Sequence, residues 1–578
     1  MARSLQLFRQ DDFTGGLNLR ADQFQLGANE SPGMLNVEVD PRGGVASRGG
    51  MSKIVTNGVV SNGTIFAGTF FATENSDPLI TEGNGDYLVL DFPVWNPENL
   101  FAFNGSTKQL MLSTGFVGGS NGLVYFGTGG NFTSTTIPVV NPDGASYAAW
   151  GSTLFVATGG SSYSWNGSTA TALLTSGDTT AGGLAVVWGT ASDHMPQAKH
   201  AITHAGKMFV ANTREYVAGT LTSFPNRIRW SDEAVVNPTR WTAANYIDIN
   251  DGGQNITGLA SFNGVLIVFK EFSVYAILGY NSDNFQVIQL SNKVGTINQN
   301  TVASTERGVY FFSWPDGLYF YNGKQIMDVF ENIRPILKKS KVNSAYTNKI
   351  YVNNINDRIW VSLPYSETDA VADPVVSFVH DPTLGTAGWT MFQTADGFGI
   401  AGGCTYTKSD GTVINAAAHP FVDSVLNVDI ASNQTDNIAG TDDAYASYYL
   451  TRWIDGRNYA MKKMFRRPDF VLKQTVTARS LTVGVFHDYE EASEQKVFTL
   501  NLSSAGTAAL WADIFNPTAN DARWDTSRFG LANEGAVIET GANLGLARSV
   551  QLKISGPTGL SWGVDSFTIK YNPRKVKA

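Results

Sequence analysis

Residues 308–323 read GVYFFSWPDGLYFYNG and contain two short apolar runs, 308–312 and 318–321. Both runs are rich in aromatic and β-branched residues, which favour strands. Asp316-Gly317 separates the runs, and Asn322-Gly323 follows the second one. Asp-Gly and Asn-Gly favour the two-residue turn of a β-hairpin, because both central residues of that turn have positive φ. The stretch therefore predicts a hairpin that leads directly into another turn.

The same signal recurs through all 578 residues, which contain fourteen such pairs. They begin at Asn57, Asn62, Asn84, Asn104, Asn121, Asn166, Asn263, Asn322, Asp143, Asp251, Asp316, Asp396, Asp410 and Asp455. The 59 glycines and the 12% aromatic content also favour strands joined by tight turns. The best helical candidate is one or two turns at residues 333–338. An all-β chain with few short helices is predicted.

A degenerate repeat indicates how the hairpins are organised. A turn followed by an apolar strand begins at residues 151, 206, 264, 308 and 348, so successive starts differ by 55, 58, 44 and 40 residues. Four strands in roughly 40 to 50 residues are typical of one β-propeller blade. Such irregular spacing is also compatible with a sandwich that has long loops. We predict an irregular propeller-like body and leave its number of blades between five and seven.

Changes in composition and in the pattern of apolar residues divide the chain into three parts. Residues 1–50 are glycine-rich and are predicted to be an assembly arm. Residues 51–428 form the propeller-like domain, and the polar stretch 429–437 starts a C-terminal domain over 429–578. In that domain, residues 481–486, 496–502, 549–554 and 567–571 largely alternate between apolar and polar, as half-exposed strands do. A second β domain, either a sandwich or a barrel, is expected.

Charge and cysteine content exclude several classes of protein. The net charge of −9 argues against an overall basic surface that grips nucleic-acid phosphates. Cys404 is the only cysteine, so the chain can form neither an internal disulfide nor a zinc site of several thiolates. The first residues lack the apolar core of a secretory signal, and no stretch approaches the ~20 apolar residues that span a bilayer. We expect a protein made in a cytoplasm, without a membrane-spanning segment.

No motif indicates catalysis. His200 and His204 are four residues apart, a spacing that suits a metal on a helix, but the residues after them predict a turn and a strand. We interpret them as incidental histidines of a loop. Neither a G-x-S-x-G nucleophile elbow nor a phosphate-binding loop is present. We therefore predict no catalytic residue, no metal, no cofactor and no enzymatic activity.

The N-terminal stretch resembles a known family. FTGGLN at residues 13–18, Asp22, ESPGMLNV at 30–37 and GGVASRGG at 43–50 resemble the opening of bacteriophage tail nozzle proteins, also called tail tubular protein B, from short-tailed phages. The last element departs from the family pattern, because Gly49 follows Arg48 where a proline is often found. The resemblance continues to residue 323 through short motifs at 229–232, 241, 258–259, 266–270, 273–275, 294–295 and 316–323.

The resemblance implies a structural virion protein. Six copies would form a ring that continues the tail tube below a dodecameric adaptor, retains the packaged genome and opens for DNA ejection. Genomic double-stranded DNA would pass through the lumen without sequence-specific binding, and tail fibres or spikes are possible partners. The chain would be assembled in the host cytoplasm and reside in the phage tail. The loops of the DNA gate are unknown from the sequence.

Candidate partner contacts lie in the arm and in a local cluster of positive charge. They are Phe13, Gly16, Asn18, Asn36, Arg42 and Arg48 in the arm, and Lys462, Arg466 and Arg467 in the C-terminal domain. The cationic residues are either solvated strand faces or an interface with an acidic neighbour. The arm is expected to order against a neighbouring subunit. The alternative function is a receptor- or glycan-binding tail component, possibly with polysaccharide hydrolase activity, because propellers and aromatic-rich loops also bind sugars.

Overall fold

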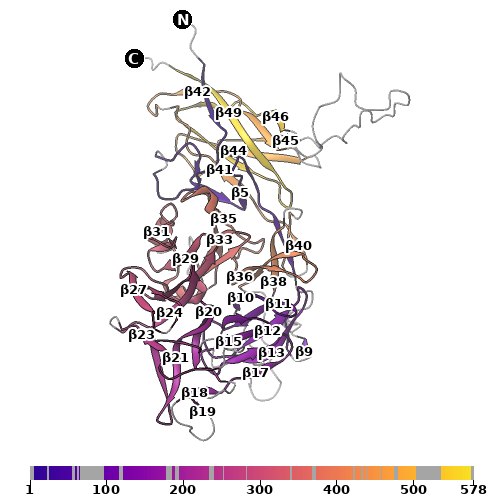
Figure 1. The fold of residues 1–578 in the computed structure, drawn as a ribbon. Coiled ribbons are helices and arrows are strands. Elements are labelled where there is room, and N and C mark those ends of the chain that lie inside the picture. Colours follow the sequence, from indigo (N-terminus) through magenta and orange to yellow (C-terminus); the bar gives the residue numbers. More distant parts are fainter. Residues whose placement is uncertain are drawn as a thin grey trace, which may run out of the picture.

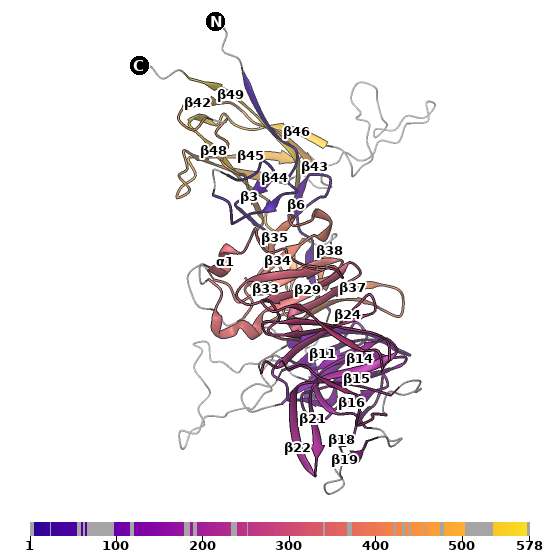
Figure 2. The same ribbon diagram turned by 60° about the vertical axis from the view of Figure 1, so that its left-hand side comes forward.

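The computed structural model describes residues 5–22, 25–54, 59–61, 64–65, 97–115, 121–177, 185–188, 194–232, 240–250, 253–281, 283–338, 341–366, 371, 373–420, 424–430, 434–438, 441–456, 458–473, 479–502 and 536–574. These residues form two β bodies stacked into an elongated molecule (Figures 1 and 2). The larger body is a propeller, and the smaller one is a sandwich that contains β49, the last strand of the chain. The predicted all-β, propeller-like fold with a C-terminal sandwich is confirmed.

The propeller contains seven consecutive sheets within the described residues, each with a core of antiparallel strands, which we number blades 1 to 7. Blade 1 has β10 (Pro97–Asn104), β11 (Lys108–Thr114), β12 (Gly122–Gly127) and β13 (Phe132–Val139), extended by β8 (Val59–Ser61) and β9 (Thr64–Ile65). Blade 2 has β14 (Ser146–Trp150), β15 (Thr153–Ala157), β16 (Tyr163–Trp165) and β17 (Ala170–Ala172). Blade 3 has β20 (Gln197–His204), β21 (Lys207–Val217), β22 (Thr220–Trp230) and β23 (Tyr246–Asp248), with β18 (Thr175–Gly177) and β19 (Ala185–Val187).

The remaining blades follow in chain order. Blade 4 has β24 (Ile256–Phe262), β25 (Val265–Lys270), β26 (Val274–Leu278) and β27 (Gln286–Ser291), and blade 5 has β28 (Val302–Thr305), β29 (Gly308–Ser313), β30 (Gly317–Tyr321) and β31 (Ile326–Asp328). Blade 6 has β32 (Tyr351–Ile355), β33 (Arg358–Leu363), β34 (Val376–His380) and β35 (Trp389–Phe392). Blade 7 has β36 (Gly403–Thr407), β37 (Val413–Ala418), β38 (Val425–Ile430), β7 (Gly50–Lys53), β39 (Asp436–Asn437) and β40 (Asp442–Asp443).

The blades close into a ring through their first strands. In chain order, β10, β14, β20, β24, β28, β32 and β36 each contact the next, and β36 contacts β10. β7 comes from the N-terminal part of the chain and pairs antiparallel with β38 on the outer side of blade 7. The last blade therefore contains strands from both ends of the propeller sequence, and pairing between them closes the ring.

The sandwich consists of two sheets. The first contains β46 (Ala536–Thr540), β43 (Asp469–Lys473), β49 (Gly563–Pro573), β42 (Lys463–Phe465), β47 (Gly545–Ala547), β1 (Gln6–Gln10), β5 (Val37–Val39) and β6 (Val45–Ser47). The second contains β4 (Gly33–Leu35), β41 (Tyr448–Leu450), β48 (Val550–Ser555), β44 (Arg479–His487) and β45 (Lys496–Leu502). Four strands of the arm, β1, β4, β5 and β6, thus belong to the C-terminal sandwich.

Burial explains the strand sequences of both bodies. β25 reads VLIVFK and is buried along almost its whole length, because neighbouring blades cover both of its faces. The two sheets of the sandwich, in contrast, pack against each other and enclose one apolar core between them. That core, which contains Val483, Leu552 and Phe567, is continuous with apolar residues of blades 5 and 6 such as Phe312 and Trp389. One hydrophobic cluster therefore joins the sandwich to the propeller.

Helical segments are short. They are α1 (Pro335–Lys338), η1 (Gln299–Thr301), η2 (Ser344–Lys349) and η3 (Pro382–Leu384), and α1 lies where the sequence predicts a helical turn. A two-stranded sheet of β2 (Gly16–Leu17) and β3 (Glu30–Ser31) completes the arm. Among the described residues, no helix has the length and apolar character that a membrane crossing requires.

The repeat is more regular than the sequence interpretation implied. Second strands begin at Lys108, Thr153, Lys207, Val265, Gly308, Arg358 and Val413. The predicted start at residue 348 is instead the approach to β32, the first strand of blade 6. The equivalent hairpin of blade 6 turns at Asn356-Asp357, both with positive φ. That pair lacks glycine, so a search for Asn-Gly and Asp-Gly missed it.

Most of the predicted turns use a different geometry from the expected one. Asn263 and Gly264 both have positive φ, at 48° and 74°, as the two-residue hairpin turn requires. In Asn322-Gly323, Asp316-Gly317 and Asp410-Gly411 only the glycine does, so these are other turn types. The predicted pairs at Asn57, Asn62, Asn84 and Asp251 lie outside the described residues.

The predicted domain boundaries do not coincide with the ends of the sheets. Residues 428 and 429 fall inside β38, and the polar stretch 429–437 contributes β39 to blade 7. Polar composition indicated a linker, but β39 is held by parallel pairing to β7, a contact between distant parts of the chain. Likewise, the arm over residues 1–50 pairs with its own C-terminal sandwich instead of remaining a separate segment.

Candidate functional site

Asn36 and Arg48, two of the predicted partner contacts, lie in a buried cluster where the arm, blades 6 and 7 and the sandwich meet. Arg48 is 1% exposed, and its guanidinium forms a two-point ion pair with Asp436, at 2.5 Å from Nη2 to Oδ2 and 3.0 Å from Nη1 to Oδ1. The guanidinium also lies 3.8 Å above the ring of Tyr445 and donates to the Gln393 carbonyl. We call Asn36, Arg48, Gln393, Asp436 and Tyr445 the junction cluster.

Asn36 connects the members of this cluster. Its Oδ1 accepts hydrogen bonds from Arg48 Nε at 2.9 Å and from the backbone N–H of Gln393 at 2.8 Å, and its Nδ2 donates to the Ala446 carbonyl. Its φ is 52°, a conformation that asparagine tolerates better than most residues. Asp436 additionally accepts from the backbone N–H groups of Met51 and Ala395. The buried charge pair is thus fully hydrogen-bonded, as burial of ions requires.

Phe13, Gly16 and Asn18 are also inside the chain. Phe13 packs edge-on against Tyr449, with ring centroids 5.1 Å apart. Gly16 has a φ of +63°, and a Cβ there would lie 2.6 Å from the Trp389 carbonyl oxygen, so only glycine fits. Asn18 Oδ1 accepts from the N–H groups of residues 20 and 21, and its Nδ2 donates to Glu30.

Five of the six arm residues that the sequence predicted as partner contacts are therefore buried within the chain. This corrects their expected position and that of the arm, which packs on its own sandwich and propeller in the described structure. The physical reason is that the arm supplies apolar residues and strands that only the C-terminal sheets can cover. Only Arg42 is exposed, with 91% of its side chain accessible.

The predicted cations of the C-terminal domain share one environment. Lys462, Arg466 and Arg467 are exposed, so they remain candidate partner contacts. Lys463 is buried, and its Nζ donates to the carbonyls of residues 461 and 548. Lys473 pairs with Asp40 at 3.4 Å. The three cations named from the sequence are thus exposed, whereas Lys463 and Lys473 are bonded within the chain.

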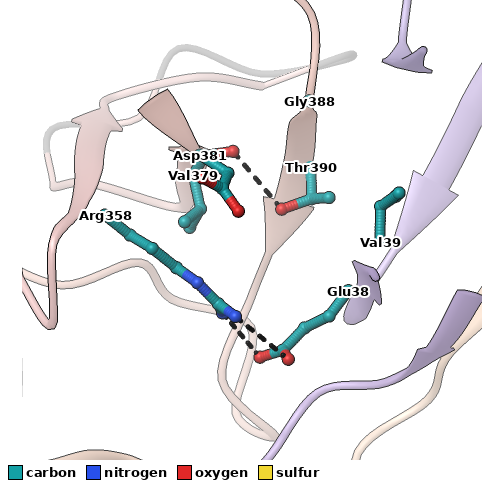
Figure 3. Close-up of a pocket in the computed structure, with 7 residues that line it drawn as sticks. All are labelled: Glu38, Val39, Arg358, Val379, Asp381, Gly388 and Thr390. Atoms are coloured by element: carbon teal, nitrogen blue, oxygen red, sulfur yellow. Dashed lines mark hydrogen bonds and ion pairs between the residues drawn. The ribbon is translucent and has the colours of Figure 1, made fainter. Parts of the chain in front are cut away.

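A pocket lies between the arm and blade 6 (Figure 3). Glu38 of β5 and Arg358 of β33 form a two-point ion pair across it, with distances of 2.9 and 3.4 Å. Asp381 and Thr390 lie on the opposite wall, where Thr390 Oγ1 donates to the Val379 carbonyl. Glu38 and Arg358 are paired with each other, and Asp381 accepts from Thr383, so we interpret the pocket as a second contact between arm and propeller.

A second buried polar cluster crosses the propeller axis. Glu98 of β10 in blade 1 accepts hydrogen bonds from Tyr351 Oη at 3.2 Å and Asn300 Nδ2 at 3.1 Å, and Lys349 Nζ lies 3.4 Å from its other oxygen. These partners belong to the start of blade 5 and to blade 6, whereas blade 7 lies between blades 6 and 1 in the ring. The contacts therefore span the centre of the ring.

Burial dominates the electrostatics of this axial cluster. Desolvation raises the pKa of Glu98 from 4.5 to about 7, and the Lys349 ammonium opposes that rise. Desolvation also raises the pKa of Asp143, which the charge of Lys199 opposes. Glu98 could not be predicted from the sequence, because a single glutamate beside a proline carries no local signal.

The histidines correct another expectation. His200 and His204 lie on β20 in blade 3, not in a loop, and face β24 of blade 4. His200 Nε2 donates to the Ile256 carbonyl at 3.2 Å, and burial lowers its pKa to about 4. His204 Nδ1 lies 2.7 Å from Ser261 Oγ. In the part of the chain that the structure describes, no group of three or more His, Cys, Asp or Glu side chains could hold a metal ion.

Comparisons with known proteins add little to this picture. No protein-family model and no curated protein matches the chain. Among solved structures, the chain is similar to the Pan2 WD40 domain of Neurospora crassa, at 10% sequence identity and a TM-score of 0.33, with 57% of this chain and 88% of that domain covered. A TM-score this low carries no argument, so the propeller arrangement rests on the blade-to-blade contacts described above.

Proposed function

We propose that this chain is a structural subunit of the tail nozzle of a short-tailed bacteriophage. Six copies form a ring that continues the tail tube below a dodecameric adaptor, holds the packaged genome and opens for its ejection. Its partners are further copies of itself, the adaptor, tail fibres or spikes, and DNA that passes without sequence-specific binding. Its location is the virion tail, after assembly in the host cytoplasm.

The junction cluster is the observation that carries the proposal. Asn36 and Arg48 belong to the stretch that resembles the opening of nozzle proteins, and they fasten the sandwich to blades 6 and 7 through buried hydrogen bonds. A charge pair that is 1% or less exposed and fully bonded holds one geometry, because any displacement leaves an ion unpaired. Two β bodies held in one relative orientation are suited to the wall of a tube that withstands the pressure of a packaged genome.

Charge and shape support the same function. A subunit with a net charge of −9 offers a passing polyanion few contacts, since each lumenal Lys or Arg would add an attractive interaction with phosphate. The molecule is elongated (Figure 2), so copies can stand side by side around a bore. A ring of this kind needs two different patches on each subunit, one for each neighbour.

Cryo-electron microscopy of the particle that contains this chain tests the proposal. We expect six copies around a central channel, directly below a twelve-fold ring. Three copies at the periphery of the tail would overturn it and favour the receptor- or glycan-binding alternative. Incubating the purified chain with capsular polysaccharide tests the hydrolase form of that alternative, because a hydrolase lowers the viscosity of the polymer and a nozzle subunit leaves it unchanged.

A further inference from the structure

The 3-10 segment η2 (Ser344–Lys349) is held on the propeller by polar contacts and not by apolar burial. It contains no buried residue, and Tyr346 in its middle has non-helical φ and ψ and is 41% exposed. Asn343, the residue before it, anchors its N-terminal end, because the Asn343 Nδ2 donates to the Val371 carbonyl. A segment with few buried apolar contacts opens at a low free-energy cost, so its polar contacts decide whether it stays in place.

Two contacts retain the C-terminal end of η2. The Asn348 carbonyl accepts from Asn298 Nδ2 at 3.3 Å, and Lys349 Nζ lies 3.4 Å from Glu98 Oε1. The Lys349 side chain is 15% exposed and the Glu98 side chain is 1% exposed, so this charge pair lies largely out of water. Such a pair retains its segment only while both partners are charged, because an ammonium without a counter-ion is more stable in solvent.

Glu98 is the partner that can lose its charge. Its other oxygen accepts from Tyr351 Oη and Asn300 Nδ2, which are neutral donors, so the ammonium of Lys349 is its cationic contact. Desolvation raises the pKa of Glu98 to about 7, against the opposing charge of Lys349. An exposed glutamate, in contrast, stays ionised down to about pH 4. Burial therefore moves the titration of this ion pair to neutral pH.

The other titratable groups around Glu98 do not replace it in this role. Tyr351 on β32 stays neutral, because burial and the charges of Glu98, Asp373 and Asp143 hold its pKa well above 10. Asp143 lies in the loop before β14, where desolvation raises its pKa and the charge of Lys199 on β20 opposes that rise. Glu98 is therefore the acid whose charge decides whether the lysine of η2 has a counter-ion.

We propose that Glu98 and Lys349 form a latch, which holds the C-terminal end of η2 on the propeller above neutral pH and releases it when Glu98 takes up a proton from solvent. On protonation, Lys349 loses its counter-ion and its side chain turns into solvent. The neutral carboxyl keeps its hydrogen bonds from Tyr351 and Asn300, so the contacts across the axis remain. The latch lies within one chain and is independent of the proposed nozzle and its copy number.

The mobility of a spin label on η2 tests the latch in the full-length chain. Tyr346→Cys places a nitroxide at an exposed position of η2. Cys404 is the only native cysteine, and burial raises its pKa to about 12, so it reacts little with the labelling reagent. We expect the electron paramagnetic resonance spectrum of an ordered label at about pH 8 and of a mobile label at about pH 6. The midpoint of the change should lie near pH 7.

Two further variants separate the latch from a general effect of pH. In Glu98→Gln and in Lys349→Gln the ion pair is absent, so the label on η2 should be mobile at both pH values. A label at Val217→Cys is the matched control, since Val217 is 40% exposed and lies in the β21–β22 hairpin, and its mobility should not change. Circular dichroism checks that every variant stays folded. Equal mobility at both pH values with Glu98 and Lys349 in place, or a change with pH that persists in Glu98→Gln, would overturn the latch.

Discussion

Arg42 and Arg48 show how far two residues of one type differ within a few positions of the arm. Arg42 is exposed and pairs with Asp40 at its own turn. Arg48 is buried, pairs with Asp436 388 positions away and lies over Tyr445. Both were predicted to contact a partner, because their charge was visible in the sequence and their environment was not.

Replacing Arg48 by alanine should destabilise the chain by about 3–5 kcal/mol, because Asp436 would remain buried without its counter-ion. Arg42→Ala is the control, and we expect a change within about 0.5 kcal/mol. Urea unfolding at neutral pH measures both. The double variant Arg48→Ala/Asp436→Ala should cost less than the sum of the single changes. Strict additivity would show that the two side chains do not stabilise each other.

Glu98 makes stability depend on pH. The pKa of Glu98 is about 7 in the folded chain, whereas its ordinary value, which applies to the unfolded chain, is 4.5. Between these two pH values the folded chain therefore binds a proton that the unfolded chain has released. Its contribution to stability is therefore lost as the pH rises from 4.5 to 7. Glutamine at position 98 cannot titrate. We therefore expect the free energy of unfolding of Glu98→Gln to rise by about 3 kcal/mol relative to that of wild type as the pH increases over that range.

Chemical unfolding of wild type and Glu98→Gln at pH 4.5, 6 and 8 measures this difference. The charge of Lys349 already contributes to the pKa of Glu98, so the trend of this difference with pH is the informative quantity. Glu490→Gln, an exposed change, controls for the loss of one charge. A difference between wild type and Glu98→Gln that stays constant with pH would contradict the raised pKa.

At the scale of elements, β7 is the strand on which the ring depends. It has only four residues, yet it pairs with β38 on one side and β39 on the other, so it holds blade 7 together. Met51 anchors it in an apolar cluster with residues of blades 6 and 7. The strand also follows directly from Arg48, so the junction cluster and the ring closure reinforce each other.

Ser52→Pro should open blade 7. Ser52 lies opposite both Asn427 and Asn437, and proline removes a ladder donor and fits poorly inside a sheet. We expect a loss of about 3 kcal/mol and faster amide exchange in β38, measured by hydrogen–deuterium exchange. Ser409→Pro is the control, because Ser409 lies in the exposed β36–β37 turn where proline is tolerated. Unchanged exchange in β38 would show that β7 is dispensable for closure.

At the scale of the molecule, a negative net charge coexists with the exposed cations Lys462, Arg466 and Arg467 at the sandwich. We expect no binding of a fluorescent duplex DNA at physiological salt, measured by anisotropy, because the net charge of −9 repels phosphate. Binding that weakens steeply with salt would contradict this expectation. If alanine at the three cations then abolished it, these residues would be DNA contacts and not contacts for an acidic protein.

Local chemistry determined much of the fold. Turn residues and apolar runs identified the hairpin at residues 308–323, now β29 and β30, and alternation identified β44, β45, β48 and β49. These features depend on neighbours within a few positions, so a single sequence contains them. The all-β class, the propeller-like body and the second β domain follow from such local signals.

Pairing between distant segments was decided only by the tertiary structure. The sequence could not show that β1 pairs with β49, that β7 completes blade 7, or that Glu98 reaches Tyr351 across the axis. It placed Asn36 and Arg48 on a partner surface, although they hold the interior together. The physical reason is that burial and ion pairing depend on which surfaces meet, and residues hundreds of positions apart meet only once the sheets have packed.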